Sequence, residues 1–178
     1  MIGQPIPRVE DRSFVTGNGQ YTDDLRVEGQ AHAAFLRSQH AHAVLRSVDV
    51  SAAREAPGVI AVLVGQDYLD DGYQGVDHVP NPVDAVDATK KAFLASLTGQ
   101  IFNQPHIPLP VDRVRYVGEP IAMVIAETPL AARNATEMID VDYDVLDAVV
   151  NAADAMRDGA PQLWDGAGGN RGVQTQIG

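Results

Sequence analysis

The stretch that decides the fold covers residues 114–145 and reads VRYVGEPIAMVIAETPLAARNATEMIDVDYDV. Its run from Ile121 to Ala126 is apolar on both faces, which predicts a strand at the centre of a sheet. Thr128 then suits a helix N-cap, and Pro129 suits the first helical position because its missing N–H has no helical partner there. The run from Ile139 to Leu146 alternates apolar and acidic residues, as half-buried strands do. The stretch therefore predicts strand, helix and strand in succession.

The predicted helix is amphipathic, and the strand after it is two-faced. The apolar stripe of the helix holds Ala131, Ala135, Met138 and Ile139, and the polar stripe holds Arg133, Asn134, Thr136 and Glu137. The apolar face of the strand holds Ile139, Val141, Tyr143 and Val145, opposite Asp140, Asp142 and Asp144. We expect the boundary between the two elements near Ile139.

Outside this stretch the pattern predicts more strands than helices. Strands are expected at residues 31–37, 44–50, 59–64 and 114–117. Gly118-Glu119-Pro120 separates the last of these from the central strand. Ser51 is expected to cap a helical turn at 52–56, which Pro57-Gly58 ends, and a short helix is expected at 152–156. Adjacent strands with isolated helices indicate the α+β class rather than a regular βαβ series.

Three parts of the chain show little periodicity. Residues 1–30 predict an extended lead-in with turns. Residues 65–110 are rich in turn residues and prolines, with a short helix predicted at 89–97, and so resemble an insertion. Residues 165–178 contain five glycines and predict a linker or a truncation point.

Composition and charge exclude several classes of function. The formal charge of −11 argues against nucleic acid and against an anionic membrane surface, because binding to either needs clustered Lys and Arg. The chain has no cysteine, which excludes disulfides and iron–sulfur ligation by its own side chains and fits a cytosolic protein. We recognise no secretory signal and no apolar run near ~20 residues that would span a membrane.

Two groups of side chains suggest a metal site, and each has a simpler explanation. Asp140, Asp142 and Asp144 share one face of a strand and offer carboxylates to a hard cation, but a solvated outer face gives the same alternation. His40 and His42, with His32 nearby, form a pair suited to zinc. The sequence shows no third ligand at a diagnostic spacing, so histidines of a turn or core are the simpler interpretation.

Other motifs carry still less chemistry. Ser38 and His40 lack an orienting third group and an oxyanion hole, as a nucleophile and base would need. Gly17-x-Gly19 lacks the third glycine and the preceding strand of a dinucleotide-binding fingerprint. Trp164, beside the glycine-rich end, is interpreted as a packing anchor, with a partner contact as the alternative.

A series of short motifs resembles one family along nearly the whole chain. The motifs are Pro7-Arg8-Val9-Glu10-Asp11, Phe14-Val15-Thr16-Gly17-x-Gly19-x-Tyr21-x-Asp23-Asp24, Leu36-Arg37-Ser38-x-His40-Ala41-His42-Ala43, Ala56-Pro57-Gly58-Val59 with Asp67, Val114-Arg115-Tyr116-Val117-Gly118-Glu119-Pro120, Ala126-Glu127-Thr128, Val141-Asp142-Tyr143 and Trp164-Asp165. In this order they resemble the start of the molybdopterin-binding large subunits of the xanthine dehydrogenase, aldehyde oxidase and aerobic carbon monoxide dehydrogenase family. Gln39 stands where that family usually has proline.

The resemblance implies an a/b-hammerhead fold, a small curved mixed β-sheet with a few short helices. It implies a lead-in at 1–30, the hammerhead at 31–158 with an insertion at about 69–110, and a Gly-rich linker at 159–178 toward molybdopterin-binding domains that this chain lacks. The parent enzyme would oxidise carbon monoxide or hydroxylate its substrate with water at molybdenum, held by molybdopterin cytosine dinucleotide. Electrons would pass through 2Fe–2S clusters to FAD on partner subunits or domains.

In that family the cofactor loops and the catalytic glutamate lie beyond the hammerhead. We therefore expect no catalytic, cofactor-binding or metal-binding residue in this chain, and we interpret Glu119 as a turn residue. The expected role is a structural and interface domain that is inactive alone, packing the cofactor domains against the iron–sulfur protein. Two alternatives stay open: a free-standing protein-binding module, and a metal-binding module built on the aspartate row or the histidine pair.

Overall fold

The computed structural model describes residues 3, 5–76, 100–102 and 106–174. Contacts within the chain divide it into two units, Met1–Ala31 and His32–Gly178. In the first unit, α1 (Asp11–Val15) and the 3-10 helix η1 (Thr22–Asp24) contain no buried residue. The rings of Phe14 and Tyr21 stack with centroids 5.6 Å apart. This unit has local order without a buried core in its described residues.

The second unit contains a sheet with the predicted central strand in its middle. Its order is β1 (His32–Arg37), β6 (Pro120–Ala126) and β3 (Val59–Val64), and both pairings are antiparallel. Four residues of β6 have no exposed surface: Ile121, Ala122, Val124 and Ala126. The continuous apolar run therefore occupies the position that its sequence predicted, because only a covered central strand removes both faces from water.

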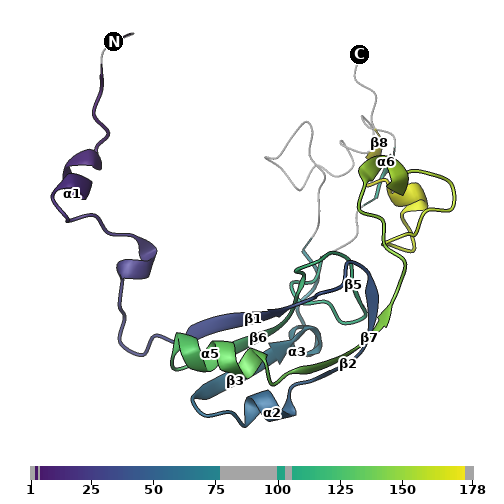
Figure 1. Cartoon of the computed structure of the whole chain (residues 1–178), viewed down its shortest axis with the longest axis horizontal. Coiled ribbons are helices and arrows are strands. Elements are labelled where there is room, and N and C mark those ends of the chain that lie inside the picture. Colours follow the sequence, from purple (N-terminus) through teal and green to yellow (C-terminus); the bar gives the residue numbers. More distant parts are fainter. Residues whose placement is uncertain (1–2, 4, 77–99, 103–105, 175–178) are drawn as a thin grey trace. The chain divides into compact units, whose positions relative to one another are not determined.

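The predicted helix forms as α5 (Pro129–Thr136) and packs on β1 and β6 of this sheet, as Figure 1 shows. The hydroxyl of Thr128 accepts a hydrogen bond from the amide of Ala131 at 3.1 Å, which confirms the N-cap. The helix ends before Met138, which is 45% exposed, so placing Met138 on the buried stripe was wrong.

A second antiparallel sheet has the order β5 (Arg113–Val114), β2 (Ala43–Asp49) and β7 (Asp140–Val145). Its core cluster contains Ala43, Leu45, Val114 and Ile121. Ile121 belongs to β6 of the first sheet, so its side chain joins the two sheets. The strand predicted at 114–117 forms only at its first residue. The prediction for residues 115–117 was wrong, because the backbone turns after Val114.

Two short helices follow strands. In α2 (Ser51–Arg54) the capping prediction was wrong, because Ser51 is the first helical residue and its amide donates to the Asp49 carboxylate at 2.9 Å. The helix α3 (Gly65–Asp70) was not predicted. The carboxylate of Asp67 accepts from the amide of Val64 at 2.8 Å and fixes its start.

The last described part contains α6 (Ala152–Ala155), the 3-10 helix η3 (Gly168–Asn170) and β8 (Val173–Gln174). The strand β8 pairs antiparallel with β4 (Gln100–Ile101). The glycine-rich segment thus forms local structure up to residue 174, while the helix predicted at 89–97 lies outside the described residues.

These elements confirm the α+β class with few and short helices. A single mixed sheet was expected, and every strand pairing in the described part of the chain is antiparallel. The second unit is therefore built mainly on two three-stranded antiparallel sheets that share the side chain of Ile121, beside the two-stranded pair of β4 and β8.

Candidate functional site

The Gly-Glu-Pro turn, residues 115–120, carries the most deeply buried carboxylate of the described residues. Glu119 is 3% exposed and accepts hydrogen bonds from the backbone amides of Arg115 and Tyr116. Burial raises the pKa of Glu119, while the Arg115 amide and guanidinium act in the opposite direction. Gly118 has φ +86°, a conformation that favours glycine. The contacts of Glu119 are those of a residue that closes a turn.

Backbone hydrogen bonds attach this turn to the end of β1. The amide of Ser38 donates to the Glu119 carbonyl at 2.9 Å, and the amide of Gly118 donates to the Ser38 carbonyl at 2.8 Å. The guanidinium of Arg37 also donates to the Gly118 carbonyl at 2.8 Å. These three hydrogen bonds join the turn to Arg37 and Ser38, and the Glu119 side chain is buried.

Arg115 extends from this turn to the C-terminal lobe, defined as residues 151–174. Its guanidinium carbon lies 3.7 Å from the centre of the Trp164 ring, and its Nε donates to the Leu163 carbonyl at 3.2 Å. Asp112 pairs with it at 3.3 Å. The Arg115 side chain is 13% exposed, so its stacked guanidinium is largely shielded from water, whereas its ion-pair partner Asp112 is 64% exposed.

Asn170 organises the C-terminal lobe from inside. Its side-chain amide donates to the carbonyls of Ala155 and Pro161, at 3.0 and 2.9 Å. Its side-chain oxygen accepts from the amide of Leu163 at 3.1 Å. Asn170 has φ +56°, which asparagine tolerates better than most residues.

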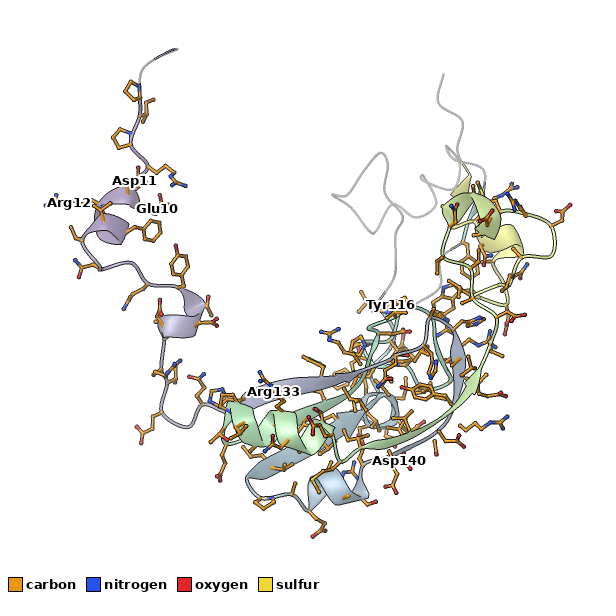
Figure 2. The ribbon with its side chains drawn as sticks, viewed as in Figure 1. Glu10, Asp11, Arg12, Tyr116, Arg133 and Asp140 are labelled. Atoms are coloured by element: carbon orange, nitrogen blue, oxygen red, sulfur yellow. The ribbon has the colours of Figure 1, made fainter. Side chains whose placement is uncertain are left out.

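A cavity of about 610 Å³ lies between the Gly-Glu-Pro turn and the C-terminal lobe. Its lining includes Phe102, Arg115, Tyr116, Glu119, Trp164 and Asn170. Figure 2 labels Tyr116, which lines this cavity, and also Arg133 and Asp140, which lie on α5 and β7. The cavity wall is mainly apolar, and its charged groups are already paired with protein partners.

The aspartate row does not converge on one point. Asp144 pairs with Arg46 at 2.6 Å, whereas Asp140 and Asp142 are exposed. These are the features of a solvated strand face.

The three histidines also take separate positions. His42 is 4% exposed, and its Nδ1 lies 2.8 Å from the Asp147 carbonyl oxygen. His40 makes an edge contact with the Tyr143 ring, with centroids 4.8 Å apart, and His32 lies in β1. No group of three or more metal-ligating side chains gathers within residues 3, 5–76, 100–102 and 106–174.

Ser38 and His40 form a local backbone motif instead of a nucleophile and base. The Ser38 hydroxyl donates to the His40 carbonyl at 2.9 Å and accepts from the His40 amide at 3.0 Å. Neither bond involves the imidazole. Gly17 follows α1 with φ +73°, as a turn glycine does. No helix of the described part of the chain has the length and apolar character to span a bilayer.

Sequence reasoning missed Arg115 and Asn170. The asparagine follows Gly168 and Gly169, and an Asn after glycines is a recognisable signal for a left-handed turn. Nothing in the sequence indicates that Arg115 and Trp164, 49 positions apart, meet.

The chain belongs to the family described as the a/b hammerhead domain of aldehyde oxidase and xanthine dehydrogenase, whose model matches residues 16–96 and 74–147. The nicotine 6-hydroxylase large subunit of Paenarthrobacter nicotinovorans is 33% identical over 159 residues, which are 89% of this chain and 17% of that protein. The carbon monoxide dehydrogenase large chain of Afipia carboxidovorans is 33% identical over 162 residues, or 91% of this chain and 17% of its own length.

Solved structures agree with these relatives. Quinoline 2-oxidoreductase from Pseudomonas putida 86 is 31% identical with a TM-score of 0.75, covering 92% of this chain and 19% of that one. The Cu,Mo-containing carbon monoxide dehydrogenase is 31% identical with a TM-score of 0.69 over 89% of this chain. The family resemblance noted from the motifs is confirmed. The chain corresponds to a hammerhead fragment of such large subunits and spans less than a fifth of these relatives' lengths.

Proposed function

We propose that this chain is a structural and interface domain in the large subunit of a molybdenum hydroxylase complex and that it performs no catalysis alone. The observation that carries the proposal is the mismatch of lengths: the chain matches relatives over nine tenths of itself but less than a fifth of them. The domain would pack the cofactor domains of the large subunit against the iron–sulfur protein.

The guanidinium of Arg115, which lines the cavity of about 610 Å³, is already paired with Asp112 and with the Leu163 carbonyl, so it is not free to hold an anionic cofactor. A pterin dinucleotide would need free donors for its phosphates. We therefore assign the molybdopterin cytosine dinucleotide to other domains of the parent subunit, and the 2Fe–2S clusters and FAD to partner subunits or domains.

The parent reaction would be oxidation or hydroxylation of a substrate with water, with electrons passing through iron–sulfur clusters to FAD. The relatives' names span nicotine, quinoline and carbon monoxide, so the substrate class is left open. The absence of cysteine from the sequence is consistent with a cytoplasmic complex, which we include in the proposal.

The test is to purify the chain alone and then together with candidate cofactor-domain, iron–sulfur and FAD polypeptides from the same source. Alone it is expected to contain no stoichiometric molybdenum and to reduce no artificial electron acceptor. Together the polypeptides are expected to co-purify at fixed stoichiometry, whereas an unrelated acidic domain of charge −11 used as control bait recovers none of them. Stoichiometric molybdenum in the isolated chain would contradict the proposal.

The second candidate is a free-standing binding module that reuses the fold. The helices of the unit Met1–Ala31, which contain no buried residue, favour this candidate, because such a segment can order on a partner. The two candidates differ in genomic context: reading frames for the cofactor domains adjacent to this one support the first, and their absence supports the second.

A further inference from the structure

Leu163 is held at both of its backbone polar groups by side chains from different parts of the fold. Its carbonyl accepts from Arg115, which belongs to the Gly-Glu-Pro turn, and its amide donates to Asn170 of the C-terminal lobe. Leu163 therefore connects the Gly-Glu-Pro turn, which is bonded to the end of β1, with the C-terminal lobe. Two backbone hydrogen bonds at a single residue restrict its position more strongly than apolar contact alone.

Arg115 adds directional contacts to this connection. Its flat guanidinium covers Trp164 at 3.7 Å while its edge donates to the carbonyls of Leu163 and Arg113, at 3.2 and 2.9 Å. A planar fork can stack and donate sideways at once, which an ammonium cannot do. The flanking ion pair between Arg113 and Asp165, at 3.6 Å, is more open because Asp165 is 89% exposed.

We propose that Arg115 is the positioning residue that couples the Gly-Glu-Pro turn to the C-terminal lobe, so that the hammerhead sheets set the path of residues 159–172. Glu119 supports Arg115 by accepting a hydrogen bond from the Arg115 amide, and Asn170 completes the connection by accepting one from the Leu163 amide. The inference concerns the chain's own fold, so it stands or falls separately from the proposed assembly with cofactor domains.

Trp164 is the single tryptophan, so its fluorescence reports this contact directly. In the unmodified chain, urea unfolding followed by Trp164 emission should coincide with the loss of sheet structure followed by far-ultraviolet circular dichroism, because the coupling makes lobe and sheets one cooperative unit. If Trp164 becomes exposed at a lower urea concentration than the sheets unfold, the coupling is refuted without any substitution.

Two variants test the residues. Arg115→Lys keeps the charge but loses the fork, and acrylamide quenching of Trp164 is expected to rise about twofold while circular dichroism stays native. Asn170→Gly keeps the positive φ and removes the three side-chain hydrogen bonds, so quenching should rise although Asn170 does not stack on the ring.

The matched control is Arg133→Lys, an exposed arginine on α5, which should leave Trp164 quenching unchanged. Amide hydrogen exchange at Leu163 gives a second measurement, with protection expected to fall about tenfold in Asn170→Gly. Native quenching of a folded Arg115→Lys variant, equal to that of the control, would overturn the role of Arg115.

Discussion

The Nδ1 atom of His42 lies 2.8 Å from the backbone carbonyl oxygen of Asp147 and ties the residue before β2 to the chain just after β7. Because a carbonyl only accepts, Nδ1 carries the hydrogen of this bond. A second hydrogen bond joins the same two segments, because the amide of Leu146 donates to the His42 carbonyl at 3.0 Å. His42 therefore closes one end of the second sheet.

We predict that His42→Ala lowers the free energy of unfolding by about 2–3 kcal/mol, because it removes a buried hydrogen bond and leaves a cavity. Urea unfolding measures this loss. His32→Ala, at the less buried start of β1, serves as the control and should cost much less. Equal losses in the two variants would show that the bond to Asp147 contributes nothing specific.

The N-cap of α5 gives a second prediction. Thr128→Ala removes the acceptor for the Ala131 amide and is expected to cost about 1 kcal/mol. Thr128→Ser keeps the hydroxyl and should restore most of that stability. Thermal unfolding compares the three chains, and a serine variant as unstable as the alanine variant would rule out capping as the cause.

The contact of α5 with its sheet depends on small side chains. Ala132 has no exposed surface, so Ala132→Leu forces three additional carbon atoms into packed space and is expected to destabilise the fold by about 1–3 kcal/mol. Leu130 on the same helix is 66% exposed, and Leu130→Ala should change stability by at most about 0.5 kcal/mol. If Ala132→Leu is tolerated equally well in urea unfolding, the helix does not pack on β1 and β6 as closely as described.

Glu119 predicts a specific pH dependence. Burial raises its pKa in the folded chain above the ordinary value, so folding favours the protonated carboxyl. Its contribution to stability is complete below the unfolded pKa and is lost as the pH rises through the folded pKa. The stability of the native chain relative to Glu119→Gln should therefore decrease as the pH is raised from about 4 to about 7.

The measurement is urea unfolding of both chains across that range. Glu137→Gln, at an exposed position after α5, is the control and should show no such trend relative to the native chain. A stability difference between native chain and Glu119→Gln that grows as the pH rises would contradict the raised pKa.

The sequence predicted best where local pattern and burial agree. The apolar run of β6, the Thr128 cap and the alternation of β7 up to Tyr143 were recognisable because strand and helix periodicities act within a few residues. The placement of Val145 on the apolar face was wrong, because Val145 is 59% exposed. The boundaries were less accurate. At α2 the Asp49 carboxylate takes the role predicted for Ser51, since both residue types accept hydrogen bonds and only the backbone path selects one.

The candidate site was less predictable than the fold. Its principal contact joins Arg115 to Trp164, and its second joins Leu163 to Asn170. Chemically, an arginine beside a turn and an asparagine after glycines resemble ordinary surface residues. Which residues they contact depends on where the two sheets place the Gly-Glu-Pro turn relative to the C-terminal lobe.

By itself, the sequence determined the class of fold, the central strand, the capped helix and the family, because these depend on residue order and short-range periodicity. Only the tertiary structure decided which buried polar groups pair. Glu119 meets the Arg115 amide, and His42 meets the Asp147 carbonyl 105 positions away. The physical reason is that a hydrogen bond requires two groups within about 3 Å in the correct direction, and only the assembled sheets fix that geometry.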